Sequence, residues 1–317
     1  MHVMLWSIIF FTCSSELIYQ FEKGISLENI AVRSNGQLPV TQIGQPEIYQ
    51  VNCQAPTFPD TVPYATGLFG IAEISTDIFA FVAGNYSSAA LSPMLAMTSP
   101  DAPTRPSMRI SKVMHIDSAM SLNGMTALQP QSHLSTLLIA DSLQSVVYHL
   151  NLQTLSYSIV LNDGATMAPL PNAIPVIGIN GFHYRPADGN FYYSNSLQEQ
   201  FNRSTYRDHW KSTTSHGCGR IHCYCRWYLQ RDFALGEYGT AYIAANPINE
   251  VFKVTQKGEV SVVAGGLNDT TVAGDASAAL GRTERDKNVQ YVATNGVTAA
   301  PVNGTYTEGG KIVAARV

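Results

Sequence analysis

Charged residues are scarce in this chain, at 13% of its 317 residues, whereas an average soluble domain has about 25%. The formal net charge is -4, so no basic surface is available of the kind that nucleic acids require. Hydrophobic residues make up 45% of the chain, enough to build a large core. We therefore expect a globular protein that has no nucleic-acid partner.

The chain also lacks an apolar run long enough to cross a bilayer, which takes about 20 residues. Residues 1–11 form a shorter apolar run, followed by small residues, but no Lys or Arg precedes it. The pattern is typical of a signal peptide, predicted over residues 1–15, with a buried first strand as the alternative. Secretion or entry into the secretory pathway is therefore expected, without a stable membrane span.

Cysteine is rare as well, and the five present are Cys13, Cys53, Cys218, Cys223 and Cys225. Cleavage after Cys13 leaves four, which allows at most two disulfides of unknown pairing. A fold built on disulfides is therefore excluded. Four glycosylation sequons, which fit a secreted protein, begin at Asn85, Asn202, Asn268 and Asn303.

A repeat runs through the chain. A Gly or Asp followed by an apolar run, a turn and a second β-rich run recurs at positions 70, 124, 178 and 232, an equal spacing of 54 residues. Two further copies begin near Glu28 and Ala278, and turn sequences such as Ser34-Asn35-Gly36, Pro186 to Gly189 and Gln256-Lys257-Gly258 separate paired runs. This period is typical of four-stranded propeller blades.

The sequence thus predicts an all-β fold: a six-bladed β-propeller with a central channel, formed by residues 16–317 as a single domain. A β-sandwich, the alternative, would show short strands without a long repeat.

Polar residues stand near the starts of the predicted inner strands, at Glu28, Asn123, Asn180 and Asp232. In a propeller such positions converge on one end of the channel. Two carboxylates with amide oxygens are suited to Ca²⁺ or another divalent metal, predicted at Glu28, Asn180 and Asp232. The alternative, equally open, is that each group satisfies backbone donors at a strand end. His183 and Tyr184 follow Asn180, and one interpretation is that one of them faces the channel and contacts substrate. The alternative is a packed or solvent-facing His183.

The segments around Glu28, Asn180 and Asp232 resemble the senescence-marker-protein/gluconolactonase (regucalcin-like) family, specifically its secreted fungal branch. In that family a Glu, an Asn and an Asp bind a divalent metal, which the resemblance assigns to these three residues. Within the branch, the chain is similar to hetero-Diels–Alderases of tropolonic sesquiterpenoid pathways.

The resemblance implies a cyclase that joins an o-quinone methide to a terpene alkene in the channel, with Glu28, Asn180 and Asp232 as its catalytic residues and no required cofactor. Asn123, His183 and Tyr184 are expected to bind the apolar small-molecule substrate. One alternative is a metal-dependent lactonase, although Glu28 is followed by Asn-Ile rather than the Gly-Pro usual there. A propeller that binds a small molecule without catalysis is the other.

One stretch, residues 201–231, breaks the repeat and concentrates basic residues, His, Cys and Trp. Its cysteine spacing lacks the paired C-x₂-C of zinc sites. A disulfide-bearing surface loop is one interpretation. The other is that a retained intron or shifted reading frame has replaced native residues, which sequencing of the transcript would test.

Overall fold

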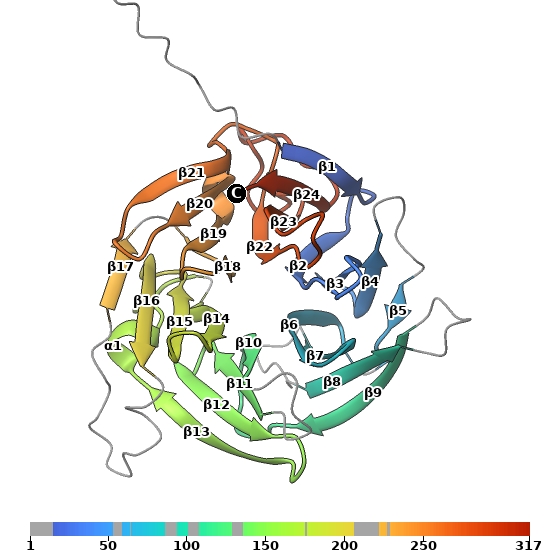
Figure 1. Ribbon diagram of the computed structural model, residues 1–317, viewed down its shortest axis with the longest axis vertical. Coiled ribbons are helices and arrows are strands. Elements are labelled where there is room, and N and C mark those ends of the chain that lie inside the picture. The colour runs from blue at the N-terminus through green and yellow to red at the C-terminus, as the bar shows by residue number, and fades with distance from the viewer. Residues whose placement is uncertain are drawn as a thin grey trace, which may run out of the picture.

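The computed structural model describes residues 15–52, 59–63, 65–85, 94–100, 108–128, 136–174, 176–205, 222–226 and 229–317. Within these residues, the strands form six four-stranded sheets arranged around one axis (Figure 1). The all-β propeller predicted from the sequence is confirmed, and each predicted copy of the repeat supplies a sheet. The predicted signal segment 1–15 lies outside the described residues except for Ser15, where β1 begins.

The strands of each sheet follow one another along the chain from the axis outward, with one exception at the chain ends. The first three sheets are β2 (Ser26–Ile30), β3 (Leu38–Ile43), β4 (Glu47–Val51) and β5 (Asp60–Thr61); β6 (Gly67–Ser75), β7 (Ile78–Gly84), β8 (Met94–Pro100) and β9 (Met108–His115); and β10 (Leu122–Ala127), β11 (Thr136–Asp141), β12 (Val146–Asn151) and β13 (Ser156–Asn162).

The next two sheets are β14 (Ile179–Arg185), β15 (Asn190–Asn195), β16 (Gln200–Thr205) and β17 (His222–Arg226); and β18 (Phe233–Leu235), β19 (Ala241–Ala245), β20 (Glu250–Val254) and β21 (Val260–Gly265). The last combines β22 (Asp275–Leu280), β23 (Val289–Thr294) and β24 (Lys311–Arg316) with β1 (Ser15–Gln20). Two short helices, α1 (Gly164–Met167) and η1 (Asn246–Ile248), lie in connections.

The two ends of the chain close the ring. β1 pairs antiparallel with β24, from Ser15 opposite Ala315 to Gln20 opposite Lys311. The last sheet therefore takes its outermost strand from the beginning of the chain, so the first and last parts of the sequence must meet before the ring is complete.

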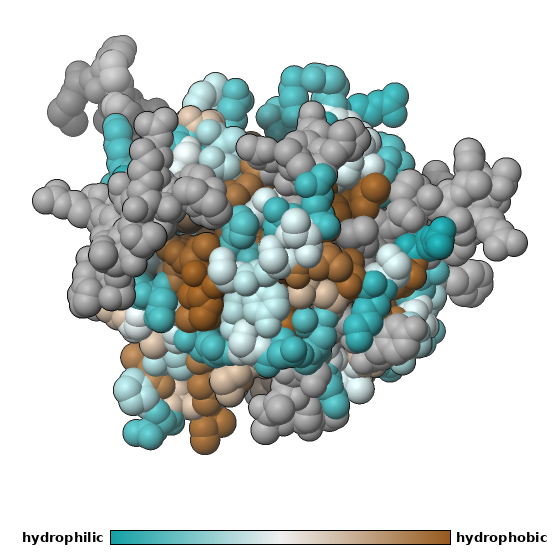
Figure 2. Space-filling model, turned by 90° about the horizontal axis from the view of Figure 1, so that it is seen from below, coloured by the Kyte–Doolittle hydropathy of each residue, from teal (hydrophilic) through white to brown (hydrophobic). Residues whose placement is uncertain are grey.

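Burial explains the composition of the strands. Second strands such as β7 and β15 are buried along almost their whole length, because each sheet is covered by its neighbours on both faces. β13, at the outside, is mostly exposed. Seen edge-on, the outside shows separate apolar patches among hydrophilic side chains (Figure 2). Ile159 of β13 and Leu155, just before it, are exposed apolar residues.

The predicted turns are confirmed in the backbone. Gly36, Gly189 and Gly258 have φ values of 84°, 67° and 81°, in the left-handed region that favours glycine. The glycines at the repeat starts differ in their positions relative to the strands, however. Gly124 lies within β10, but Gly178 precedes β14, and Gly181 is the residue of β14 that packs against the next inner strand as Gly124 does.

The stretch 201–231 contributes strands to its sheet. β16 pairs with β15 and β17 pairs with β16, while residues 206–221 lie outside the described residues, as do Cys13, Cys53 and Cys218. Asn202 is fully buried in β16, and neither of its side-chain polar atoms has a hydrogen-bond partner. The amide of Asn202 is therefore inaccessible to a glycan in the folded chain, and its glycosylation stays a prediction.

Of the other sequon residues, Asn268 and Asn303 are exposed and Asn85 is half-buried. These positions can accept a glycan, and their glycosylation stays a prediction. Among the described residues, no helix has the length and apolar character needed to cross a membrane.

Candidate functional site

The inner strands share an irregularity at the same place. Pairing with the second strand shifts register between Leu27 and Asn29 in β2, and equivalent shifts occur in β6, β10, β14 and β22. A β-bulge of this kind re-aims side chains and is common beside functional sites. Glu28, Asn123 and Asn180 each lie at one of these bulges, whereas Asp232 directly precedes β18.

Asp232 is the centre of a hydrogen-bond network that joins four sheets. Its Oδ1 lies 2.8 Å from His183 Nε2 on β14 and accepts a 2.9 Å bond from the Phe233 amide. Its Oδ2 accepts a 2.8 Å bond from Asn29 Nδ2 on β2 and lies 3.1 Å from the hydroxyl of Ser277 on β22. The side chain of Asp232 thus contacts groups from the inner strands of three other sheets.

The same network fixes its other members. Asn29 Oδ1 accepts a 2.9 Å bond from the Ile30 amide, and the Ser277 hydroxyl lies 3.0 Å from that oxygen. The hydroxyl carries one proton, so it donates either to Asn29 or to Asp232 at a given time. Asn29 and Ser277 are almost completely buried, which makes this network a rigid part of the inner ring.

The charge of Asp232 is stabilised by its partners. Burial acts to raise the pKa of this carboxyl, but the charge and hydrogen bond of His183, with the bonds from Phe233 and Asn29, hold the pKa below its usual range. Asp232 is therefore ionised at neutral pH, and the proton between it and His183 Nε2 belongs to the imidazole.

His183 is held in one orientation while part of it stays accessible. Its ring meets the Phe233 ring edge-on, with 4.6 Å between centroids, and its side chain keeps 29% of its surface exposed. The Asp232 bond fixes a proton on Nε2, which leaves Nδ1 as an acceptor in the neutral ring and as a donor in the imidazolium. Among the described contacts, Nδ1 makes no hydrogen bond.

The other predicted site residues are placed differently. Asn180 is buried and donates a 3.0 Å bond to Ser196 within its own sheet, so it does not join Asp232. Tyr184 packs against Phe191, with ring centroids 5.6 Å apart, because adjacent residues of a strand point to opposite faces. The carbonyl of Asn123 lies against Gly70, and its side chain is half-buried.

Glu28 belongs to the electrostatic surroundings of Asp232. Burial raises the pKa of Glu28 to about 6, the nearby Arg231 acts against this, and the negative charge of Asp232 adds to it. Asp275, fully buried at the start of β22, also has a pKa well above its usual value, again chiefly because of burial. Glu28 and Asp275, both with a raised pKa, thus interact electrostatically with the same arginine, Arg231.

The predicted metal set does not fit this arrangement. A carboxylate offers about four lone-pair positions, and Asp232 already has His183, Phe233, Asn29 and Ser277 within hydrogen-bond distance of its two oxygens. A divalent ion bound at Asp232 would displace at least one of these donors, and Asn180 is turned toward Ser196. Among the described residues, no group of three or more His, Cys, Asp or Glu is placed to hold a metal.

Sequence reasoning missed Asn29, Ser277 and the contact role of Phe233. Asn29 is adjacent to the predicted Glu28, but the register shift between Leu27 and Asn29 changes which side chain faces Asp232. Ser277 stands in the degenerate last copy of the repeat, where a run of Ala and Ser gives no signal of a polar contact.

No family model matches the chain. A protein of Phoma sp described as a candidate hetero-Diels-Alderase is 26% identical over 317 aligned residues, which cover 90% of this chain and 87% of that protein. The similarity therefore extends through nearly all of both chains.

Solved structures share the fold. A luciferin-regenerating enzyme superimposes with a TM-score of 0.65 at 12% identity, covering 96% of this chain and 95% of its own. Regucalcin, a calcium-binding protein of Agrobacterium tumefaciens str. C58, gives a TM-score of 0.63 at 12% identity, with the same coverage. The resemblance predicted from the sequence is thus confirmed: the chain has the fold of regucalcin-like propellers and is a distant relative of a protein described as a hetero-Diels-Alderase.

Proposed function

We propose that the protein is a cyclase of the hetero-Diels–Alderase type, which joins an o-quinone methide to the alkene of a terpene. The observation that carries the proposal is the His183–Asp232 pair: a partly exposed imidazole held in one orientation by a buried carboxylate. The extended similarity to a protein described as a hetero-Diels-Alderase supports the reaction class.

The reaction needs orientation more than chemical groups. One C–O and one C–C bond form between the heterodiene and the alkene, three π bonds are replaced by one, and no atom or proton leaves. Holding two reactants in the productive geometry lowers the barrier by several kcal/mol. A central channel open to both reactants is part of the proposal.

His183 supplies the polar contribution. In its imidazolium form, Nδ1–H donates a hydrogen bond to the heterodiene oxygen, which draws electron density from the diene and lowers the barrier to attack by an electron-rich alkene. Asp232 is a positioning residue, because its carboxylate stabilises the imidazolium and fixes its orientation. Asn29 and Ser277 in turn hold Asp232. No resident metal is needed for these steps.

The test uses purified full-length protein, an o-quinone methide released from a precursor, and a humulene-type alkene. We expect one stereoisomer of the adduct and a rate about 100-fold lower for His183→Phe. His115→Phe is the matched control, since His115 is in the outer strand β9 and, among the described residues, its side chain hydrogen-bonds only to Asp117. Racemic product at the uncatalysed rate would overturn the proposal.

The same assay separates the lactonase alternative. EDTA is expected to leave the cyclisation rate unchanged, because the donors around Asp232 leave no open position for a metal. Rapid hydrolysis of a lactone panel that is lost on adding EDTA would favour the metal-dependent lactonase instead. Tight binding of both reactants without turnover would favour a propeller that only sequesters them.

Entry into the secretory pathway is part of the proposal. It is supported by the apolar run at residues 1–11 and by the accessible sequon residues Asn268 and Asn303. Expression in a eukaryotic host should give protein in the culture medium with a new N-terminus near residue 15. Its mass should fall on glycosidase treatment. Retention in the cytosol with residues 1–15 intact would contradict it.

A further inference from the structure

Arg231, the residue before Asp232, has a fixed backbone. Its amide donates a 2.8 Å bond to the Ala244 carbonyl, and its own carbonyl accepts a bond from the Ser194 hydroxyl. The backbone of Arg231 is therefore held between β15 and β19, next to Asp232 and its hydrogen-bond network.

One donor of its guanidinium, in contrast, lacks a hydrogen-bond partner. The Nε–H is buried without any hydrogen bond, and among the described residues Arg231 forms no ion pair. Arg33, Arg185 and Arg282 each bind an acidic side chain in the same molecule. A buried N–H without an acceptor is unfavourable, so this donor is best explained by an acceptor that the chain itself does not provide.

The surroundings of Arg231 favour a ligand rather than an internal counter-ion. Glu28 and Asp275 are near enough to interact electrostatically with Arg231, but neither is within ion-pair distance of it. Asp275 also keeps one buried carboxyl oxygen, Oδ1, without a partner, while its Oδ2 accepts a 2.6 Å bond from the Ala245 amide. An unpaired donor on Arg231 and an unpaired carboxyl oxygen on Asp275 thus belong to two residues that interact electrostatically, and Arg231 directly precedes Asp232.

A guanidinium is shaped for a particular class of ligand. Its planar set of N–H donors matches two adjacent oxygen atoms, and it binds most strongly when one of them carries negative charge. His183 offers a further donor to the same ligand if it lies across the Asp232 network.

We propose that Arg231 is the anion-binding residue of this site and that the polar reactant carries two adjacent oxygens, one of them negatively charged. A carboxylate beside a hydroxyl and an ionised hydroxy-ketone belong to this class. The inference rests on the proposed function only in placing the reactant at the His183 site, and it assigns the opposite end of that reactant to Arg231.

Binding of salicylate and salicylamide, measured by titration calorimetry on the full chain, tests the proposal. The two probes share a ring and a hydroxyl, but only salicylate has the anionic oxygen pair. We expect wild-type protein to bind salicylate at least tenfold more tightly than salicylamide. This comparison needs no variant, so it stays informative even if substitutions impair folding.

Variants then assign the effect to one side chain. Arg231→Gln should bind the two probes equally, and Arg231→Lys should keep part of the preference, because an ammonium has the charge without the planar fork. Arg282→Gln is the matched control, since Arg282 is already paired with Glu73 at the far ends of the inner strands. Equal binding by wild type, or a full preference in Arg231→Gln, would overturn the proposal.

The outcome is distinguishable from failure of the cyclase. If no cyclisation occurs but the salicylate preference follows Arg231, the anion site stands and the reaction is different. If cyclisation depends on His183 while salicylate is not preferred, the cyclase stands and the role of Arg231 is wrong.

Discussion

The inner ring is joined in two different ways around its circumference. Between β6, β10 and β14 the strands approach backbone to backbone: a Cβ at Gly70 would lie 2.1 Å from the Asn123 carbonyl oxygen, and one at Gly124 would lie 2.2 Å from that of Asn180. Between β18, β22 and β2 the strands are joined by the side chains of Asp232, Ser277 and Asn29. We call these the glycine half and the polar half of the ring.

The difference shows which junctions between inner strands can hold functional side chains. Direct contact between these strands leaves no room for a side chain at their junctions, so those junctions serve mainly to hold the ring together. His183 of β14 instead contacts Asp232, across the next junction. The polar half fills the same junctions with buried hydrogen-bonding groups, which are costly unless every partner is present. Gly181 stands at the boundary, because a Cβ there would lie 2.5 Å from Asp232 Oδ1.

The largest effect on stability is expected in the glycine half. Gly124→Ala places a methyl group 2.2 Å from Asn180 O and 2.6 Å from Phe182 N, and a backbone cannot yield as a flexible side chain does. We expect the free energy of unfolding, measured by urea titration, to fall by about 3 kcal/mol.

Gly164→Ala is the matched control, because a Cβ at Gly164 would meet nothing within 4 Å and the residue lies in α1. It should leave stability unchanged or slightly higher. Equal destabilisation by the two substitutions would show that the close approach of β10 and β14 is not what holds this half together.

The second largest effect belongs to the polar half. Asp232→Asn removes the charge that binds His183 and Asn29, and we expect unfolding free energy to fall by about 2 kcal/mol and cyclisation by about 100-fold. Because the folded pKa of Asp232 is lowered, its stabilising contribution is present above the unfolded pKa and is lost as pH falls through the folded value.

Urea titrations from neutral to acidic pH therefore separate the contribution of the Asp232 charge to stability from that of its packing. The difference between wild type and Asp232→Asn should shrink as the carboxyl becomes protonated. A difference that stays constant down to the lowest pH at which the protein folds would mean that Asp232 acts by packing alone.

The same two halves show how much of the structure could be predicted from the sequence. Strand positions followed from alternation and from the repeat, because each sheet buries the same set of positions. The junctions were harder: the glycine of β14 that packs against the next inner strand is Gly181, three residues after the repeat start at Gly178. A repeat reports equal spacing, whereas the face that a residue occupies depends on the local register.

The site shows the same limit. Asp232 and His183 were predicted as site residues, and the structure brings them together at 2.8 Å. Asn180 was grouped with Asp232, but its amide is hydrogen-bonded within its own sheet. Contacts between sheets join residues far apart in the chain, such as Asn29 and Asp232, so no local sequence pattern predicts them.

A smaller effect of opposite sign is expected at Asp275, the polar-half carboxyl with an unpaired oxygen. Its folded pKa is raised, so the folded state holds the proton more tightly, and stability falls as pH rises from the unfolded value of about 3.9 toward the folded value. Asp275→Asn removes this loss and can still accept the Ala245 amide bond. We expect a gain of about 1 kcal/mol at pH 7.

The gain should disappear below pH 4, where the wild-type carboxyl is neutral in both states. Thermal unfolding of the two proteins at pH 4 and pH 7 measures this. A loss of the same size at both values would instead show that the carboxyl geometry, rather than its charge, matters in β22.

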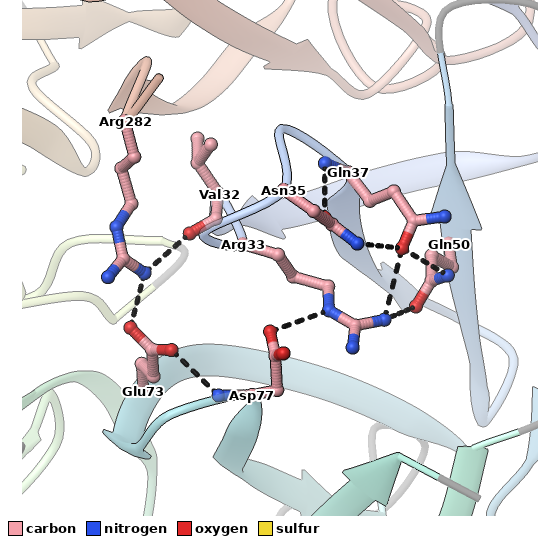
Figure 3. Close-up of polar contacts among 8 residues, drawn as sticks. All are labelled: Val32, Arg33, Asn35, Gln37, Gln50, Glu73, Asp77 and Arg282. Carbon is pink, nitrogen blue, oxygen red and sulfur yellow. Dashed lines mark hydrogen bonds and ion pairs between the residues drawn. The ribbon is translucent and has the colours of Figure 1, made fainter. Parts of the chain in front are cut away.

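The smallest effect is expected at the far ends of the inner strands, where a polar cluster links three sheets (Figure 3). Arg33 lies 3.0 Å from Asp77 and donates to Gln37 and Gln50, while Arg282 binds Glu73 and donates a 2.9 Å bond to the Val32 carbonyl. This cluster spans the sheets of β22, β2 and β6, where the polar half passes into the glycine half.

Arg282 is 40% exposed, so water competes for its contacts, and Arg282→Ala should lower unfolding free energy by less than about 1 kcal/mol without changing cyclisation. Lys287→Ala is the control, since Lys287 and Glu284 are 60% and 90% exposed and lie within one turn; it should have no measurable effect. A loss of cyclisation in Arg282→Ala would mean that the two ends of the inner strands are coupled, and that the junctions of the polar half transmit strain along their length rather than acting only where Asp232 binds.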